Sequence, residues 1–372
     1  MKMRPLISID TIEMEVQGED FLLPNASHAQ LISKEGEVLA RYQNRQEIKG
    51  KEGMHSLHAR TKNSGKTLCI EGSPYGHKYG QNVFTSPHIL PACIVALKSV
   101  CSSCEINPSP ENKAKWMAGE IDLRRVDLAA NFKISDALDA NDVLHQISLQ
   151  FLNFGIPMRR VGTSLYWAPR SGKEWTIALY AKEPEMHRKK GLKSHPQRNA
   201  LLKECENMIR IEVRLRASEL RKRGLAKASA WNEDTAYMVF SNYMKKLNFL
   251  PSIQRSFDAD ELDKLPGRLR SPYALHKAGI DLSTVFGPRT LQRYRKDFTS
   301  MGIDVRTPNH LGDHSLSLRK ILGPTKAYAE APEWMVSAGM VPRSKKLPRN
   351  PINGTTILVA GNPKKSLLLP RP

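Results

Sequence analysis

One stretch of the sequence constrains the fold more than any other, because it alternates apolar and polar residues with the period of a β-strand. In residues 174–182, Ile177 and Leu179 share one face, and Tyr180 and Lys182 share the other. A strand of this kind is buried on one side only. The chain must therefore provide other strands beside it and apolar elements beneath it.

Three further stretches alternate in the same way, and each places a carboxylate opposite aliphatic residues. They are 67–71 with Glu71, 125–128 with Arg125 and Asp127, and 209–216 with Glu212 among Arg210, Arg214 and Arg216. We expect all four to join one sheet, with its apolar face on helices. The opposite face would then gather acids, bases and a tyrosine.

The balance of charge points to a polyanionic partner. The 372 residues include 57 Lys and Arg against 37 Asp and Glu, a formal net charge of +20. Nucleic acid is the simplest such partner, and the alternative is charge that serves solubility alone. No stretch approaches the ~18 apolar residues of a membrane span. Five cysteines, an odd number, argue against a disulfide framework and for a reducing compartment.

The order of patterns predicts an α+β protein. Strands and helices mix up to about residue 216, and helical patterns dominate later, so we place one domain at 1–225 and a helical domain at 226–335. We expect 44–66 to be a polar loop and 184–200 to be a mobile basic linker. A basic tail at 336–372, rich in Pro, Lys, Arg, Asn and Gly, is typical of disorder.

Within the second domain, residues 273–298 have the order helix, turn at Gly279, short helix, turn and basic helix. This order is similar to that of a helix-turn-helix unit. The last helix would carry Arg289, Arg293, Arg295 and Lys296. The alternative is a helix pair whose charged face is simply solvated.

The polar face of the predicted sheet suggests phosphoryl-transfer chemistry. Two carboxylates ~4 Å apart repel by about 1 kcal/mol in water and roughly 4 at an effective dielectric constant of 20, so Glu71, Asp127 and Glu212 would need a cation. Oxygen ligands select Mg²⁺ or Mn²⁺. Tyr180 would attack a phosphate, and Lys182 would favour its phenolate. The alternatives are a packing tyrosine and an ordinary cross-strand ion pair at Glu212.

At these residues the chain resembles the gene II replication initiators of filamentous bacteriophages. The resemblance follows the chain in order over about residues 5–335. Its segments are 68–74 with 80–84, 125–127, 176–182, 208–214 with Gly224 and Leu225, 290–305 and 332–334. The strands of Tyr180 and Glu212 are also similar to those of rolling-circle initiators from Gram-positive plasmids.

The resemblance implies a nicking-joining enzyme that acts in the cytoplasm of a bacterial host. It would cut one strand of a double-stranded phage origin, hold the 5′-phosphate on tyrosine, leave a 3′-OH primer and later rejoin the displaced strand. The implied fold is related to the HUH endonucleases, with an open-faced antiparallel sheet backed by helices. Double- and single-stranded DNA would be its partners, with host helicase, polymerase and a second copy on DNA as further candidates.

One departure from HUH enzymes concerns the metal ligands. The sequence has no His-hydrophobic-His pair, since His55 and His58 are three apart, and position 81 is glutamine where relatives are expected to have histidine. A metal must therefore depend on the three carboxylates, with His77 as a further candidate ligand. For DNA we expect phosphate contacts from Arg125, Arg210, Arg214, Arg216, Lys189, Lys190, Arg289, Arg293, Arg295 and Lys296.

Two rival functions fit parts of the same sequence. The first is a non-catalytic, sequence-specific DNA-binding regulator that uses the region resembling a helix-turn-helix. The second is an RNA-binding protein that stacks bases on Tyr75 and Tyr79 in the glycine-rich stretch after Glu71. Should Tyr180 not be the nucleophile, Tyr166 is the first alternative.

Overall fold

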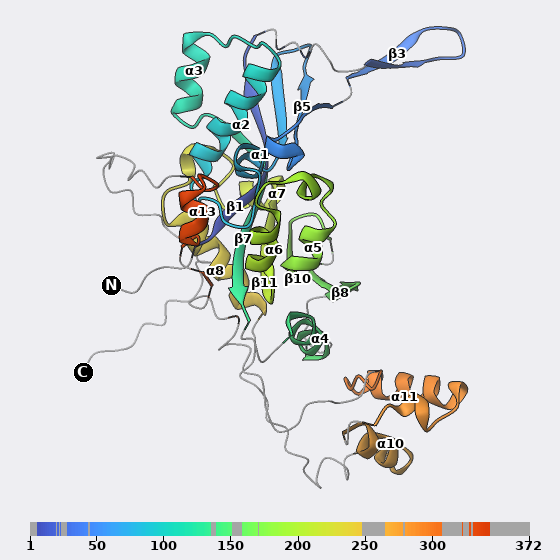
Figure 1. The fold of residues 1–372 in the computed structure, drawn as a ribbon. Helices are drawn as coiled ribbons and strands as arrows, with labels where there is room; N and C mark the ends of the chain where they lie inside the picture. Colours follow the sequence, from blue (N-terminus) through green and yellow to red (C-terminus); the bar gives the residue numbers. More distant parts are fainter. Residues whose placement is uncertain are drawn as a thin grey trace, which may run out of the picture. The chain divides into compact units, whose positions relative to one another are not determined.

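The computed structural model describes residues 6–19, 21, 23, 28–43, 45–134, 139–150, 158–169, 171–247, 265–277, 280–306, 322, 327–328 and 330–342. Within them the chain forms a nine-stranded sheet, a separate hairpin, and helices packed on the sheet (Figure 1). All pairings are antiparallel. The α+β class is thereby confirmed.

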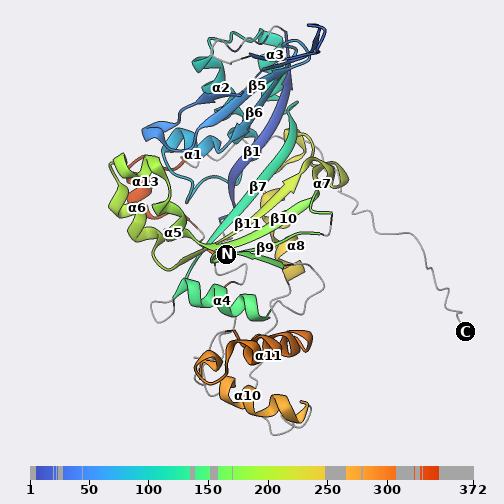
Figure 2. The ribbon, with the colours of Figure 1, turned by 90° about the vertical axis from the view of Figure 1, so that its right-hand side faces the viewer.

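The large sheet has the order β4-β5-β6-β1-β7-β11-β10-β9-β8, and its central strands follow one another in Figure 2. Its strands are β1 (Ser8–Gln17), β4 (Gln46–Ile48), β5 (Leu57–Lys62), β6 (Thr67–Gly72), β7 (Asp122–Lys133), β8 (Met158–Val161), β9 (Ser164–Trp167), β10 (Trp175–Ala181) and β11 (Met208–Arg216). The hairpin pairs β2 (His28–Ile32) with β3 (Val38–Gln43). The four strands predicted around Glu71, Asp127, Tyr180 and Glu212 therefore lie in one sheet.

The register places the expected polar residues on one face, because directly opposed residues point to the same side. Tyr180 is opposite Arg210, and Arg214 is opposite both Thr176 and Asp127. The other face is apolar and is covered by helices. Buried residues of α2, α4 and α8 share one core cluster with the strands, and Trp175 meets Tyr243 of α8 edge-on, with 5.3 Å between ring centroids.

The helices that pack on the sheet, or lie close to it, come from both halves of the chain. They are α1 (Pro74–Tyr79), α2 (Ile89–Ser103), α3 (Pro110–Met117), α4 (Ala140–Gln150), α5 (Lys182–His187), α6 (Arg198–Cys205), α7 (Ala217–Lys222), α8 (Thr235–Leu247) and α13 (Glu333–Ser337). Short 3₁₀ helices occur at η1 (Lys51–Gly53), η3 (Lys190–Ser194) and η4 (Ala228–Ala230). None of the helices in the described ranges has the length and apolar character needed to cross a membrane.

Two predictions about irregular segments are wrong. Residues 44–66 contain β4 and β5, because Leu57 and Ala59 are buried and alternate with more exposed neighbours. Residues 184–200 are not a mobile linker, since they form parts of α5 and α6 with η3 between them. Met186 and Leu192 anchor this segment in a small second core cluster. A few apolar residues in a charged segment are thus enough to order it.

A third cluster holds the basic helical region together. It contains α10 (Gly267–Lys277), η5 (Leu282–Thr284) and α11 (Pro288–Ser300), with Leu269, Leu291 and Phe298 in its small core. The predicted sequence of helix, short helix and basic helix is confirmed, while Gly279 lies outside the described residues. Residues 343–372, most of the predicted tail, also lie outside them. The domain boundaries stay a prediction.

Candidate active site

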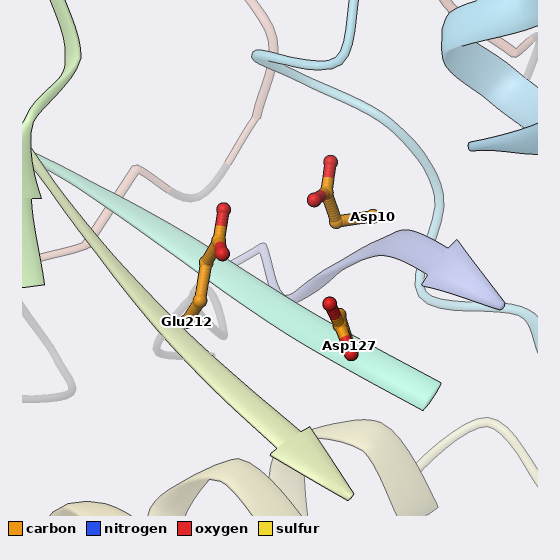
Figure 3. A group of neighbouring side chains, drawn as sticks. All are labelled: Asp10, Asp127 and Glu212. Carbon is orange, nitrogen blue, oxygen red and sulfur yellow. The ribbon is translucent and has the colours of Figure 1, made fainter. Parts of the chain in front are cut away.

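Three carboxylates from neighbouring strands meet on the polar face of the sheet. Asp10 of β1, Asp127 of β7 and Glu212 of β11 each offer an oxygen, and these oxygens lie within 4.8 Å of one another (Figure 3). Their side chains are largely buried, with exposed fractions of 9%, 1% and 12%. Such a cluster is stable only if cations balance it.

Asp10 enters this group through a β-bulge. Ile9 is opposite Leu128 and Thr11 is opposite Asp127, so β1 has one extra residue between them, and that residue is Asp10. A bulge interrupts the alternation of side chains and redirects the extra residue. This explains why the sequence pattern did not identify Asp10: it lies between Ile9 and Thr11, where the phase of the strand shifts.

Arg210 supplies the central positive charge. It is fully buried, and its guanidinium lies 3.0 Å from Asp10 and 3.1 Å from Glu212. Its Nη1 also donates to the backbone carbonyl of Asn82, at 2.9 Å. Arg210 was predicted to contact DNA phosphate, but here its guanidinium is engaged inside the protein.

Asp127 is held by two further arginines. Arg125 donates to both of its oxygens, at 2.9 and 2.5 Å, and Arg214 donates to Oδ2 at 3.1 Å. Such paired guanidinium contacts fix the plane of a carboxylate. Arg125 also reaches Glu71 at 3.3 Å.

Tyr180 stands at the edge of the carboxylate group. Its side chain is partly exposed, and its hydroxyl donates a hydrogen bond of 2.5 Å to Oε1 of Glu212. Burial, together with the negative charge of Glu212, raises the pKa of Tyr180 well above its usual value. The phenol is therefore protonated at neutral pH, and its proton already points at a carboxylate.

The two carboxylates beside Arg210 respond differently to their surroundings. Burial raises the pKa of Glu212, and repulsion from Asp10 adds to the increase. Burial would also raise the pKa of Asp10, but attraction to Arg210, Lys182 and Lys189 outweighs it and lowers that pKa. Glu212 is therefore the more basic of the two, which suits a group that accepts a proton from Tyr180.

Two lysines border the site behind Asn82, whose amide nitrogen donates to Asp10 at 2.7 Å. Lys182 is fully buried and lies 3.3 Å from Oδ1 of Asn82, and Lys189 lies 3.1 Å from the same oxygen. Glu185 pairs with both, at 2.6 and 3.2 Å. Burial and repulsion from Lys182 lower the pKa of Lys189 to about 8. The lysines thus add positive potential next to Asp10.

The predicted site residues divide into groups. Tyr180, Asp127 and Glu212 lie together, with Lys182 5.8 Å from the tyrosine ring, whereas Glu71 lies outside the carboxylate group and pairs with Arg45 and Arg125. His77 is also outside this group. The predicted phosphate-binding residues that are exposed are Arg216, Lys190, Arg289, Arg293 and Lys296, while Arg214 and Arg295 are partly buried.

The donor set suits a hard divalent ion. All three candidate ligands are carboxylates, which Mg²⁺ and Mn²⁺ prefer. Tyr180 and Arg210 both contact Oε1 of Glu212, which leaves Oε2 as the oxygen that, among the described residues, is available to a cation. Burial and mutual repulsion among the acids favour uptake of positive charge. The fit rests on Asp10, Asp127 and Glu212.

Comparison with known proteins identifies the family of this chain. The family model that describes the N-terminal part of the replication-associated gene II protein matches residues 9–234, which include all three carboxylates and Tyr180. The chain is 28% identical over 242 residues to the replication-associated gene II protein of Enterobacteria phage I2-2, covering 64% of this chain and 69% of that protein. No solved structure matches. The resemblance to gene II replication initiators is thus confirmed, and the chain belongs to the gene II family of phage replication-associated proteins.

Proposed function

We propose that this protein starts rolling-circle replication by nicking one strand of the phage origin through Tyr180, and later rejoins the displaced strand. The observation that carries the proposal is the hydrogen bond from Tyr180 to Glu212, beside a group of three largely buried carboxylates. A packing tyrosine has no need of such a neighbourhood. The family match supports the role in replication.

The reaction follows from the contacts. Glu212 accepts the phenolic proton, and the Tyr180 oxygen attacks the scissile phosphorus. The bond from phosphorus to the 3′-oxygen breaks, so the 5′-phosphate stays on tyrosine and the 3′-oxygen leaves as a hydroxyl after taking a proton. Attack by a later 3′-hydroxyl on the phosphotyrosine reverses these steps. The bond energy is retained in the phosphotyrosine, and joining needs no nucleotide cofactor.

The surrounding residues position and neutralise the reacting groups. Arg210 keeps Asp10 and Glu212 in place, and Arg125 and Arg214 do the same for Asp127. A Mg²⁺ or Mn²⁺ ion held by the three carboxylates would offset the charge that builds up on the phosphate. Lys182 and Lys189 add positive potential on the other side of Asp10.

The proposal extends to fold and partners. An open antiparallel sheet that carries the tyrosine on an inner strand supports a relation to the HUH endonucleases. Exposed Arg289, Arg293 and Lys296 on α11 are suited to contact origin phosphates. Host helicase, polymerase and a second copy of the chain stay predictions.

A supercoiled plasmid that carries the phage origin tests the reaction. With Mg²⁺, the wild-type protein should yield open circles bearing covalently attached protein, seen after denaturation with detergent. Tyr180→Phe should bind the plasmid and leave it intact. Tyr166→Phe is the matched control, because Tyr166 is opposite Ala178 on the same face. Cutting by Tyr180→Phe would refute the assignment, and retardation without cutting by the wild type would favour a regulator.

A further inference from the structure

A polar cavity lies on the same sheet. Its volume is about 420 Å³, and its charged lining is Glu13, Glu15, Lys62, Arg124, Arg125 and Arg216. Four cationic side chains face two carboxylates, so the lining has a formal net charge of +2. A cavity with this excess of donors and positive charge is suited to an anion.

A second β-bulge builds this cavity. Glu13 is opposite Arg125 and Met14 is opposite Leu123, so β7 has one extra residue, which is Arg124. The guanidinium of Arg124 is thereby brought to Glu15, with hydrogen bonds of 2.9 and 2.6 Å. The same pair of strands thus has two bulges: one directs Asp10 into the carboxylate group and the other directs Arg124 into the cavity.

Glu15 holds the two cations that form one wall. Lys62 lies 2.5 Å from its Oε1, and Arg124 contacts its Oε2. Burial would raise the pKa of Glu15, but hydrogen bonds from Lys62 and Arg124 lower it instead. One carboxylate therefore fixes two cationic groups in place and leaves their combined charge positive, which reduces the entropy lost when they bind a ligand.

Arg125 connects the cavity to the proposed active site. It lines the cavity, and it also holds both oxygens of Asp127. Arg216 is exposed at the end of β11, opposite Arg125 in the register. Cationic side chains therefore continue along the sheet from the carboxylates to the cavity.

We propose that this cavity is a phosphate subsite that holds the DNA backbone next to the nick, with Lys62 and Arg124 as residues that bind phosphate. The inference rests on the proposed function, since it assigns a DNA-binding surface to the same site. Contacts from guanidinium and ammonium groups to phosphate carry no information about base sequence, so the subsite would hold any DNA strand. The subsite keeps the strand aligned while Tyr180 holds one of its ends.

The test compares two double variants that lose the same charge. The test variant, Lys62→Gln with Arg124→Gln, removes both cations of the cavity wall. The control, Lys98→Gln with Lys113→Gln, removes two cations from α2 and α3, away from the cavity. Binding of a fluorescent oligo(dT) probe is measured by anisotropy over a range of salt concentrations. We expect about tenfold weaker binding for the cavity variant, and a salt slope smaller by about 1.4, for two lost single-strand contacts.

Nicking of the origin plasmid separates this inference from the proposed function. At saturating DNA the cavity variant should still form the covalent complex through Tyr180, and the DNA concentration required should rise. Equal binding and equal salt slopes in both double variants would overturn the phosphate subsite and leave Tyr180 untouched. Loss of cutting at saturating DNA, with binding unchanged, would also overturn it. A melting temperature for each variant confirms that it folds.

Discussion

The substitution Arg210→Met is expected to destabilise the protein by an amount that depends on pH. Arg210 is fully buried and balances Asp10 and Glu212. Methionine fills similar space without charge, so the pair of carboxylates would carry one negative charge that Arg210 no longer balances. Removing one member of a buried ion pair typically costs about 3–5 kcal/mol.

The free energy of protonating a carboxylate sets an upper limit to this loss of stability. An unpaired carboxylate takes up a proton instead of staying charged, and at pH 7 that costs about 4 kcal/mol for a group whose unfolded pKa is near 4. At pH 5 the same step costs only about 1.4 kcal/mol. Backbone carbonyls of Asn82 and Val83 also lose a donor, which adds about 1 kcal/mol. The expected loss is therefore about 5 kcal/mol at pH 7 and about 2 at pH 5.

The sign of the pH dependence follows from proton binding. In the variant, the folded state binds a proton that the unfolded state has released, so the stability of the variant falls as pH rises from 5 to 7. Urea denaturation followed by tryptophan fluorescence measures this at both pH values. Arg216→Met, at an exposed position, is the control and should cost under about 0.5 kcal/mol. A loss below about 1 kcal/mol at pH 7, or an equal loss at both pH values, would refute the balancing role of Arg210.

Two other predictions concern the ligand set and a partly buried histidine. In the plasmid assay with titrated Mg²⁺, Asp10→Asn should lower the rate of metal-dependent nicking by at least about tenfold. Glu71→Gln should leave this rate within about threefold of the wild type. The reverse order would favour Glu71 as the metal ligand. Burial, with repulsion from Lys189, lowers the pKa of His55 to about 3. The folded protein therefore binds fewer protons than the unfolded chain, and its stability falls as pH drops below about 6.5. Between pH 7 and 5 the free energy of unfolding of the wild type should fall by about 2 kcal/mol more than that of His55→Asn, as measured by urea denaturation. Asparagine is chosen because it tolerates the positive φ of His55, 51°. Equal losses in the two proteins would contradict the low pKa of His55.

Much of the architecture was predictable from local pattern. Alternation in 174–182 and 209–216 predicted neighbouring strands with Tyr180 and Glu212 on one face, and the register confirms that face. The basic helix at 289–296 was predicted from its spacing and lies within α11. These features depend on residues close together in the chain, so a period of two or 3.6 is enough to find them.

The composition of the site was decided by tertiary structure. Asp10 joins the carboxylates, and Arg124 joins the cavity, because bulges shift one strand against the next, and no periodic pattern predicts where a ladder slips. Arg210 shows the same limit. Its place in the alternating pattern predicts the face of the sheet on which its side chain lies. Whether that side chain contacts DNA or buried acids depends on residues 82 and 83, which are far away in sequence. The sequence by itself determined which residues share the polar face along each regular stretch of strand, since that follows from backbone geometry. The fold alone decided which of them are covered and paired, since burial depends on segments that meet only when the chain is compact.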